Sequence, residues 1–140
     1  MVVYLPLSAE SLQHWASTGV LGGRHQGFTV ERDFLEAIGL ESGEEADYNI
    51  LSLASLDAAQ VYGKRLVAVV EAEAESAGSL GRVWVEDPKF KNVLSLFVGE
   101  EDEVPDLAGL SLEEAWDSAS CFFAENDMLW YEPGEWATLI

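Results

Sequence analysis

The stretch Leu66-Val67-Ala68-Val69-Val70 is apolar at every position and lies between Arg65 and Glu71. A strand with one face in water alternates apolar and polar side chains, whereas this run offers apolar side chains to both sides. Its length is that of a strand and is well below the roughly 20 apolar residues that cross a membrane as a helix. We therefore predict a strand in the interior of a sheet.

Three helices are predicted on the N-terminal side of this strand, and two of them have clear local signals. One helix is expected to run to about Tyr62, and its apolar residues from Ile50 onward cover more than a narrow stripe, so we expect it to lie against the sheet with little exposure. Acidic residues between 41 and 47 stand at its start, where they interact favourably with the helix dipole. A first helix is predicted after Ser8, which can serve as its N-cap, with Gly19 ending it.

Further periodic stretches complete the predicted order of elements. A helix is expected over about 29 to 38, and another after Ser111, where Ser111 and Glu114 form a capping box. The remaining strands are expected at Val2–Leu5, Val83–Val85, Val93–Val98 and Met128–Tyr131. A hairpin is expected between the second and third of these.

The order β-α-α-α-β-β-β-α-β predicts an α+β fold in a single domain, residues 1–140. We expect a two-layer α/β sandwich with about four helices and a mostly antiparallel or mixed sheet of about five strands. The apolar side chains on both faces of the interior strand leave a three-layer arrangement open. The residues expected to share one core are Leu51, Ala54, Val67, Val69, Trp116 and Phe123.

The charge balance narrows the class of partner. The chain has 140 residues, 26 acidic and 7 basic, and a net charge of −19. So few basic residues argue against binding to nucleic acid or to anionic membranes. A strongly negative surface steers basic partners, so we expect a non-enzymatic binding or regulatory domain with a basic or amphipathic protein partner. A nucleic-acid mimic, with carboxylates spaced like phosphates, is left open.

The densest acidic run is the candidate interaction surface. Glu100, Glu101, Asp102 and Glu103 are consecutive and are followed by Pro105, which favours a solvated loop. The run lacks the ligand spacing of a calcium-binding loop. We expect neither a metal site nor a cofactor.

A second hypothesis is a small-ligand site or an enzyme that uses His14, Arg24 and His25. These are the two histidines of the chain and an arginine, and Arg24 and His25 fall in a glycine-rich segment expected to be a mobile loop. The segment lacks the ending of a phosphate-binding loop, and the chain has no His-x-x-x-His or Cys-x-x-Cys spacing. No residue is therefore assigned a catalytic role.

The single cysteine and the termini bear on location and assembly. Cys121 stands beside Phe122 and is expected to be a small buried side chain rather than a nucleophile. With one cysteine no intrachain disulfide forms, and the N-terminus lacks the features of a signal peptide, so a cytoplasmic protein is expected. Trp130, Tyr131 and Trp136 could form a homodimer contact.

Several short motifs carry a resemblance to a known family. They include Val3-Tyr4-Leu5-Pro6, Phe28-Thr29-Val30, Glu44-Glu45-Ala46-Asp47-Tyr48 and Met128-Leu129-Trp130-Tyr131. On these motifs the chain resembles a family of short, acidic, uncharacterised actinobacterial proteins, a domain of unknown function, over nearly its full length. The resemblance implies no known activity and therefore no catalytic residue.

Overall fold

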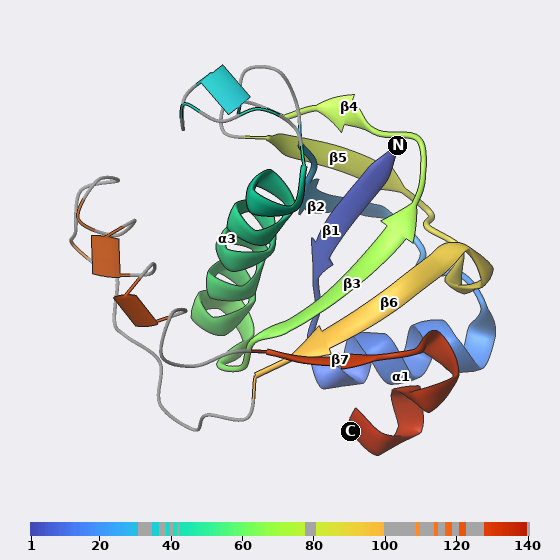
Figure 1. Cartoon of the computed structure of the whole chain (residues 1–140). Helices are drawn as coiled ribbons and strands as arrows, with labels where there is room; N and C mark the ends of the chain where they lie inside the picture. Colours follow the sequence, from blue (N-terminus) through green and yellow to red (C-terminus); the bar gives the residue numbers. More distant parts are fainter. Residues whose placement is uncertain are drawn as a thin grey trace.

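A seven-stranded sheet forms the centre of this computed structural model (Figure 1). The structure describes residues 1–30, 35–36, 39, 41, 43–77, 81–99, 109, 114, 117–118, 121–122 and 128–139. Within them the strand order is β4-β5-β2-β1-β3-β6-β7, and every neighbouring pair is antiparallel. The strands are β1 (Val2–Pro6), β2 (Arg24–Phe28), β3 (Leu66–Glu71), β4 (Glu75–Ser76), β5 (Arg82–Glu86), β6 (Val93–Val98) and β7 (Leu129–Tyr131).

The strand predicted for the interior of the sheet is confirmed. β3 lies between β1 and β6, with Val69 opposite Tyr4 on one side and Ser95 on the other. Every residue from Leu66 to Val70 is buried, and exposure begins at Glu71.

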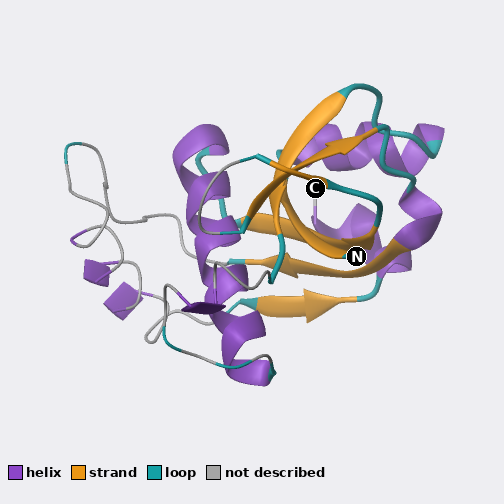
Figure 2. Ribbon diagram, turned by 90° about the horizontal axis from the view of Figure 1, so that it is seen from above, coloured by secondary structure: helices purple, strands orange, loops and turns teal. Residues whose placement is uncertain are grey.

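Helical segments cover both faces of the sheet, which lies between them in Figure 2. On one face α3 (Glu44–Tyr62) packs Ile50 against Val67 of β3. On the other face α1 (Ala9–Thr18) and the 3-10 segment η2 (Pro133–Leu139) pack against residues such as Ala68. The expected two-layer sandwich is therefore wrong, and the three-layer arrangement is correct, because a strand that is apolar on both faces needs a cover on both.

The predicted core is confirmed as far as the structure describes it. Leu51 and Ala54 of α3 form one buried cluster with Val67 and Val69 of β3. Trp116 and Phe123, expected in the same core, lie outside the described residues, as do the capping-box residue Ser111 and most of the helix expected over 29 to 38.

Two of the three helices predicted before the interior strand, α1 and α3, are present, and α1 has the expected ends. The Ser8 hydroxyl accepts a hydrogen bond of 3.1 Å from the backbone N–H of Ser11 at the start of α1. Gly19 ends this helix with a φ of 88°, a conformation that glycine adopts without steric cost. In the described part of the chain, no helix combines the length and the apolar character that a membrane crossing requires.

All five predicted strands are present, but β2 and β4 were not predicted. β2 reads Arg-His-Gln-Gly-Phe, which has no alternation of apolar and polar side chains. Its glycine, Gly27, is required by packing, because a Cβ there would lie 2.7 Å from Cγ1 of Val3. β4 has only two residues, too few for any pattern.

The expected hairpin between β5 and β6 is wrong. β5 pairs with β2 and β4, whereas β6 pairs with β3 and β7. Between them the chain runs along the loop after α1. There the N–H of Leu21 donates to the carbonyl of Pro88 (3.1 Å), and the N–H of Phe90 donates to that of Gly19 (2.9 Å). These bonds hold the connection away from a tight turn, and a 3-10 segment, η1 (Phe90–Asn92), leads into β6.

Candidate functional site

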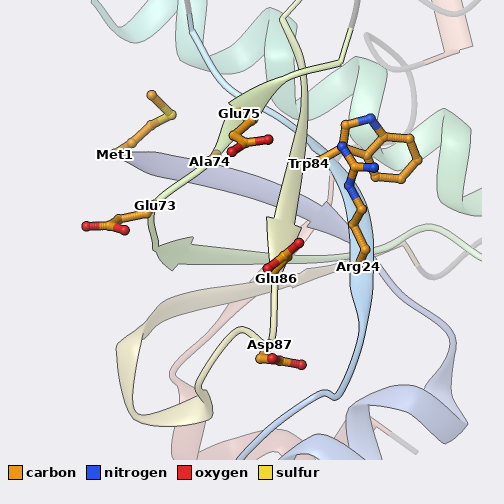
Figure 3. A pocket seen from close by; sticks show the side chains of 8 residues that line it. All are labelled: Met1, Arg24, Glu73, Ala74, Glu75, Trp84, Glu86 and Asp87. Atoms are coloured by element: carbon orange, nitrogen blue, oxygen red, sulfur yellow. The ribbon is translucent and has the colours of Figure 1, made fainter.

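An open pocket of about 700 Å³ lies beside β4 and β5, near the N-terminus (Figure 3). Met1 and the segment Glu73–Glu75, which leads into β4, line one side. Trp84, Glu86 and Asp87 line the other side together with Arg24 of β2. The site is thus assembled from four separate segments of the chain.

The pocket residues of β2 and β5 project from the face of the sheet that carries α3. Phe28 of β2 packs in the cluster under α3, and Arg24 lies an even number of residues before it, so both share this face. Glu86 is the partner of Arg24 across the β2–β5 pair, and Trp84 is two residues before Glu86. Glu75 of β4 is the partner of Trp84. Arg24, Trp84, Glu75 and Glu86 therefore belong to one continuous surface.

An arginine stacks on the aromatic ring of this surface. The guanidinium carbon of Arg24 lies 4.5 Å from the centre of the Trp84 ring, and Figure 3 shows the two side chains together. Among the described residues, no carboxylate comes within 4 Å of this guanidinium. A cation over an indole face is attracted by the quadrupole of the ring. The Trp84 ring thus already binds one positive charge, that of Arg24.

Four carboxylates line the same pocket as this stack: Glu73, Glu75, Glu86 and Asp87. The amino group of Met1 is held by Glu71 at 2.6 Å. The carboxylate of Asp87 accepts a hydrogen bond of 2.7 Å from the N–H of Gly23. The remaining three carboxylates of the rim, those of Glu73, Glu75 and Glu86, are in exposed residues. Carboxylates outnumber cations in this lining, so the pocket favours a positively charged ligand.

Of the three residues expected to form a small-ligand site, only Arg24 lines the pocket. His14 lies on α1 and is exposed. His25 follows Arg24 in β2 and therefore points to the opposite face of the sheet, where its Nε2 lies 3.0 Å from the carbonyl oxygen of Gly22. Arg24 and His25 belong to a strand, so their expected place in a mobile loop is wrong.

The pocket carboxylates were missed at the level of sequence, although one signal was present. Glu71, Glu73 and Glu75 alternate with alanine, a spacing that places their side chains on one side of an extended chain. The acidic surface was instead expected at Glu100, Glu101, Asp102 and Glu103, which lie outside the described residues.

The other candidate residues are also placed. Cys121 is exposed, so the expectation of a buried cysteine is wrong. Tyr131 and Trp136 pack against the core on the α1 side, whereas Trp130 is 57% exposed. In the part of the chain that the structure describes, no three His, Cys, Asp or Glu side chains are grouped as metal ligands would be.

Two titratable groups away from the pocket have altered proton affinity. Burial, assisted by the negative charge of Asp47, raises the pKa of Tyr4 to about 12. Burial also raises the pKa of Asp57 on α3, although the nearby positive charge of Arg82 acts in the opposite direction.

A comparison with family models identifies the family of this chain. The model of a family of unknown function, DUF6912, matches residues 1–140. This confirms the resemblance to a domain of unknown function that was drawn from the short motifs. No curated protein and no solved structure matches the chain.

Proposed function

This chain belongs to a family whose function is unknown, and we propose that it is a non-enzymatic binding domain whose acidic pocket docks a basic protein partner. The acidic pocket is the cavity rimmed by Glu73, Glu75, Glu86 and Asp87. Its partner presents lysine or arginine side chains to these carboxylates.

The observation that carries this proposal is the gathering of four carboxylates around one cavity. They come from both sides of the pocket, so a basic side chain that enters meets negative charge on each side. The net charge of −19 adds a long-range field that attracts basic proteins and speeds their encounter with the surface.

A catalytic use of His14, Arg24 and His25 receives less support from the same geometry. Arg24 alone lines the cavity, and His25 faces the other side of the sheet. Binding of a partner needs no general base or nucleophile. The pocket is open and mostly charged, which suits a binding surface, whereas many enzyme active sites exclude water.

The cytoplasm is the proposed location. The chain has one cysteine, Cys121, and it is exposed. An exposed free thiol is best preserved in a reducing compartment.

The test measures the affinity for a lysine-rich peptide, Lys-Val-Lys-Val-Lys-Val-Lys, by titration calorimetry at low salt. The triple variant Glu73→Gln, Glu75→Gln, Glu86→Gln should weaken binding at least tenfold, because it removes three charges at the pocket. The control variant Glu10→Gln, Glu41→Gln, Glu132→Gln removes the same charge at exposed residues that do not line the pocket. It should weaken binding by no more than about threefold.

Two outcomes would contradict the proposal. Equal losses in the two variants would mean that the overall charge attracts the peptide and the pocket does not. An absence of binding to the unmodified protein at low salt would remove the basic partner itself.

A further inference from the structure

At the edge of the sheet beside the acidic pocket, one residue of β5, Glu86, lacks a paired residue in β4. β4 pairs with β5 only through Glu75 with Trp84 and Ser76 with Val83. Glu86 lies two residues beyond Trp84, still within β5, and the next hydrogen-bonded pair of the ladder would join it to Glu73. That pair is not formed, because β4 begins only at Glu75.

The direction of the Glu86 backbone groups follows from two neighbouring hydrogen bonds. The N–H of Asp87 donates to the carbonyl of Gly23 on the β2 side of the strand (2.9 Å). On the opposite side, the carbonyl of Arg82 accepts from the N–H of Ala77, which follows β4 (2.9 Å). Successive residues of an antiparallel strand direct their N–H and C=O groups to alternate sides. Those of Glu86 therefore point to the β4 side.

The acidic pocket occupies the space into which these groups point. Glu73 and Glu75 line it on one side and Glu86 on the other. Because Asp87 bonds to Gly23, the register of the β2–β5 pair makes Arg24 and Glu86 a pair without mutual hydrogen bonds. No other hydrogen bond of the Glu86 backbone to a described residue is found. One donor and one acceptor of the sheet edge thus face an open, negatively charged cavity.

An extended peptide satisfies this pair of groups better than an isolated cation does. An amine or guanidinium supplies donors only, whereas one residue of an extended peptide offers both an N–H and a C=O at the spacing of a strand. Paired residues of neighbouring strands place their side chains on the same face. The residue opposite Glu86 would therefore share the face of Glu86, Trp84 and Arg24, where a lysine or arginine meets the carboxylates.

We propose that a lysine- or arginine-rich segment of a protein partner adds to the edge of β5 as a short strand, with its backbone paired to Glu86 and a basic side chain beside Glu86 and Trp84. This inference rests on the proposed function, since it specifies how the basic partner is held. Charge selects the partner, and the open position of the ladder sets its orientation.

The test uses the alternation of a strand. In the peptide Lys-Val-Lys-Val-Lys-Val-Lys, pairing that puts lysine opposite Glu86 directs the lysine N–H groups toward β5 and the valine N–H groups away from it. N-methylation of the lysines should weaken binding about tenfold or more, since it removes the paired donors. The matched control, N-methylation of the valines, should change the affinity by no more than about twofold.

Amide hydrogen exchange of the protein gives a second measurement. Binding of the unmodified peptide should slow exchange of the Glu86 N–H, for which the described residues offer no backbone acceptor, by at least tenfold. The exchange of the N–H of Asp87, already bonded to Gly23, serves as the internal reference.

The outcomes separate this inference from the proposed function. Equal affinities of the two methylated peptides without protection at Glu86 would overturn strand addition. If binding were still lost in the triple pocket variant, the acidic pocket would nevertheless remain the docking site. Failure of the unmodified peptide to bind at all would overturn both.

Discussion

The guanidinium carbon of Arg24 lies 4.5 Å from the centre of the Trp84 ring, so a cation of the protein itself covers the aromatic side chain of the acidic pocket. Arg24 has two opposite effects there. It lowers the repulsion among the carboxylates of Glu73, Glu75 and Glu86, and it competes with a ligand cation for the ring. The residue therefore sets how strongly the pocket attracts basic groups.

Replacement of Arg24 should strengthen the binding of basic peptides. Arg24→Gln removes a positive charge from the pocket lining and uncovers the Trp84 ring, so the affinity for the lysine-rich peptide should rise about two- to fivefold. The control Lys64→Gln makes the same charge change at an exposed residue outside the pocket and should raise it by less than twofold. Calorimetric titration of both variants measures the difference, and a weaker affinity of Arg24→Gln would show that Arg24 contacts the peptide favourably.

Substitution of Trp15 should destabilise the fold. This side chain is fully buried, its Nε1 donates a hydrogen bond of 2.9 Å to the carbonyl of Pro88, and its ring packs edge-on against Phe90 at 5.6 Å. Trp15→Phe removes one of the two hydrogen bonds of the Pro88 carbonyl, which keeps the bond from the N–H of Leu21, and leaves space in the core. It should cost about 1–3 kcal/mol, while Trp15→Ala should cost about 3–5 kcal/mol. Urea unfolding tests both against His14→Ala at the exposed neighbouring position, which should change stability by less than about 0.5 kcal/mol.

Tyr4 should make the protein sensitive to strong alkali. Burial raises its pKa to about 12 from the usual 10.0, so the unfolded chain loses the phenolic proton before the folded protein does. The stabilisation is fully present below pH 10 and is lost as the pH rises through 12, by about 3 kcal/mol. Unfolding of Tyr4→Phe over this range should show a smaller alkaline loss, and parallel curves for the two proteins would contradict the assignment.

Asp57 should destabilise the protein at neutral pH. Because burial raises its pKa, the folded protein holds the carboxyl proton more tightly than the unfolded chain does. That contribution is present at acid pH and is lost as the pH rises through the folded pKa. Asp57→Asn should therefore be more stable than the parent at pH 7, with the difference shrinking toward acid pH. A loss of stability at pH 7 would mean that the attraction between Asp57 and Arg82 outweighs the cost of burial.

Salt should stabilise the folded state. A net charge of −19 repels itself more strongly in a compact domain than in an expanded chain. Between 0.01 and 0.1 M salt the Debye length falls from about 30 Å to about 10 Å, which screens this repulsion. The Tm should rise over this range in differential scanning calorimetry. A constant or falling Tm would show that the carboxylates are compensated locally.

The amino-acid sequence by itself determined the elements whose signals are local. Five consecutive apolar residues from Leu66 to Val70 required an interior strand, and that strand is β3. Ser8 and Gly19 set the two ends of α1, because a cap acts on the backbone within one turn. The broad apolar surface of the helix Glu44–Tyr62 likewise predicted that it is largely buried.

Only the tertiary structure decided the strand order and the pocket. β2 is a strand because β1 and β5 satisfy its backbone hydrogen bonds, although its own side chains carry no strand pattern. Arg24 and Glu86 reach one cavity from distant parts of the chain, and Arg24 contacts Trp84 across two paired strands. Such contacts depend on which strands pair. Pairing is set by residues far apart in the chain, and the local periodicity of the sequence carries no information about them.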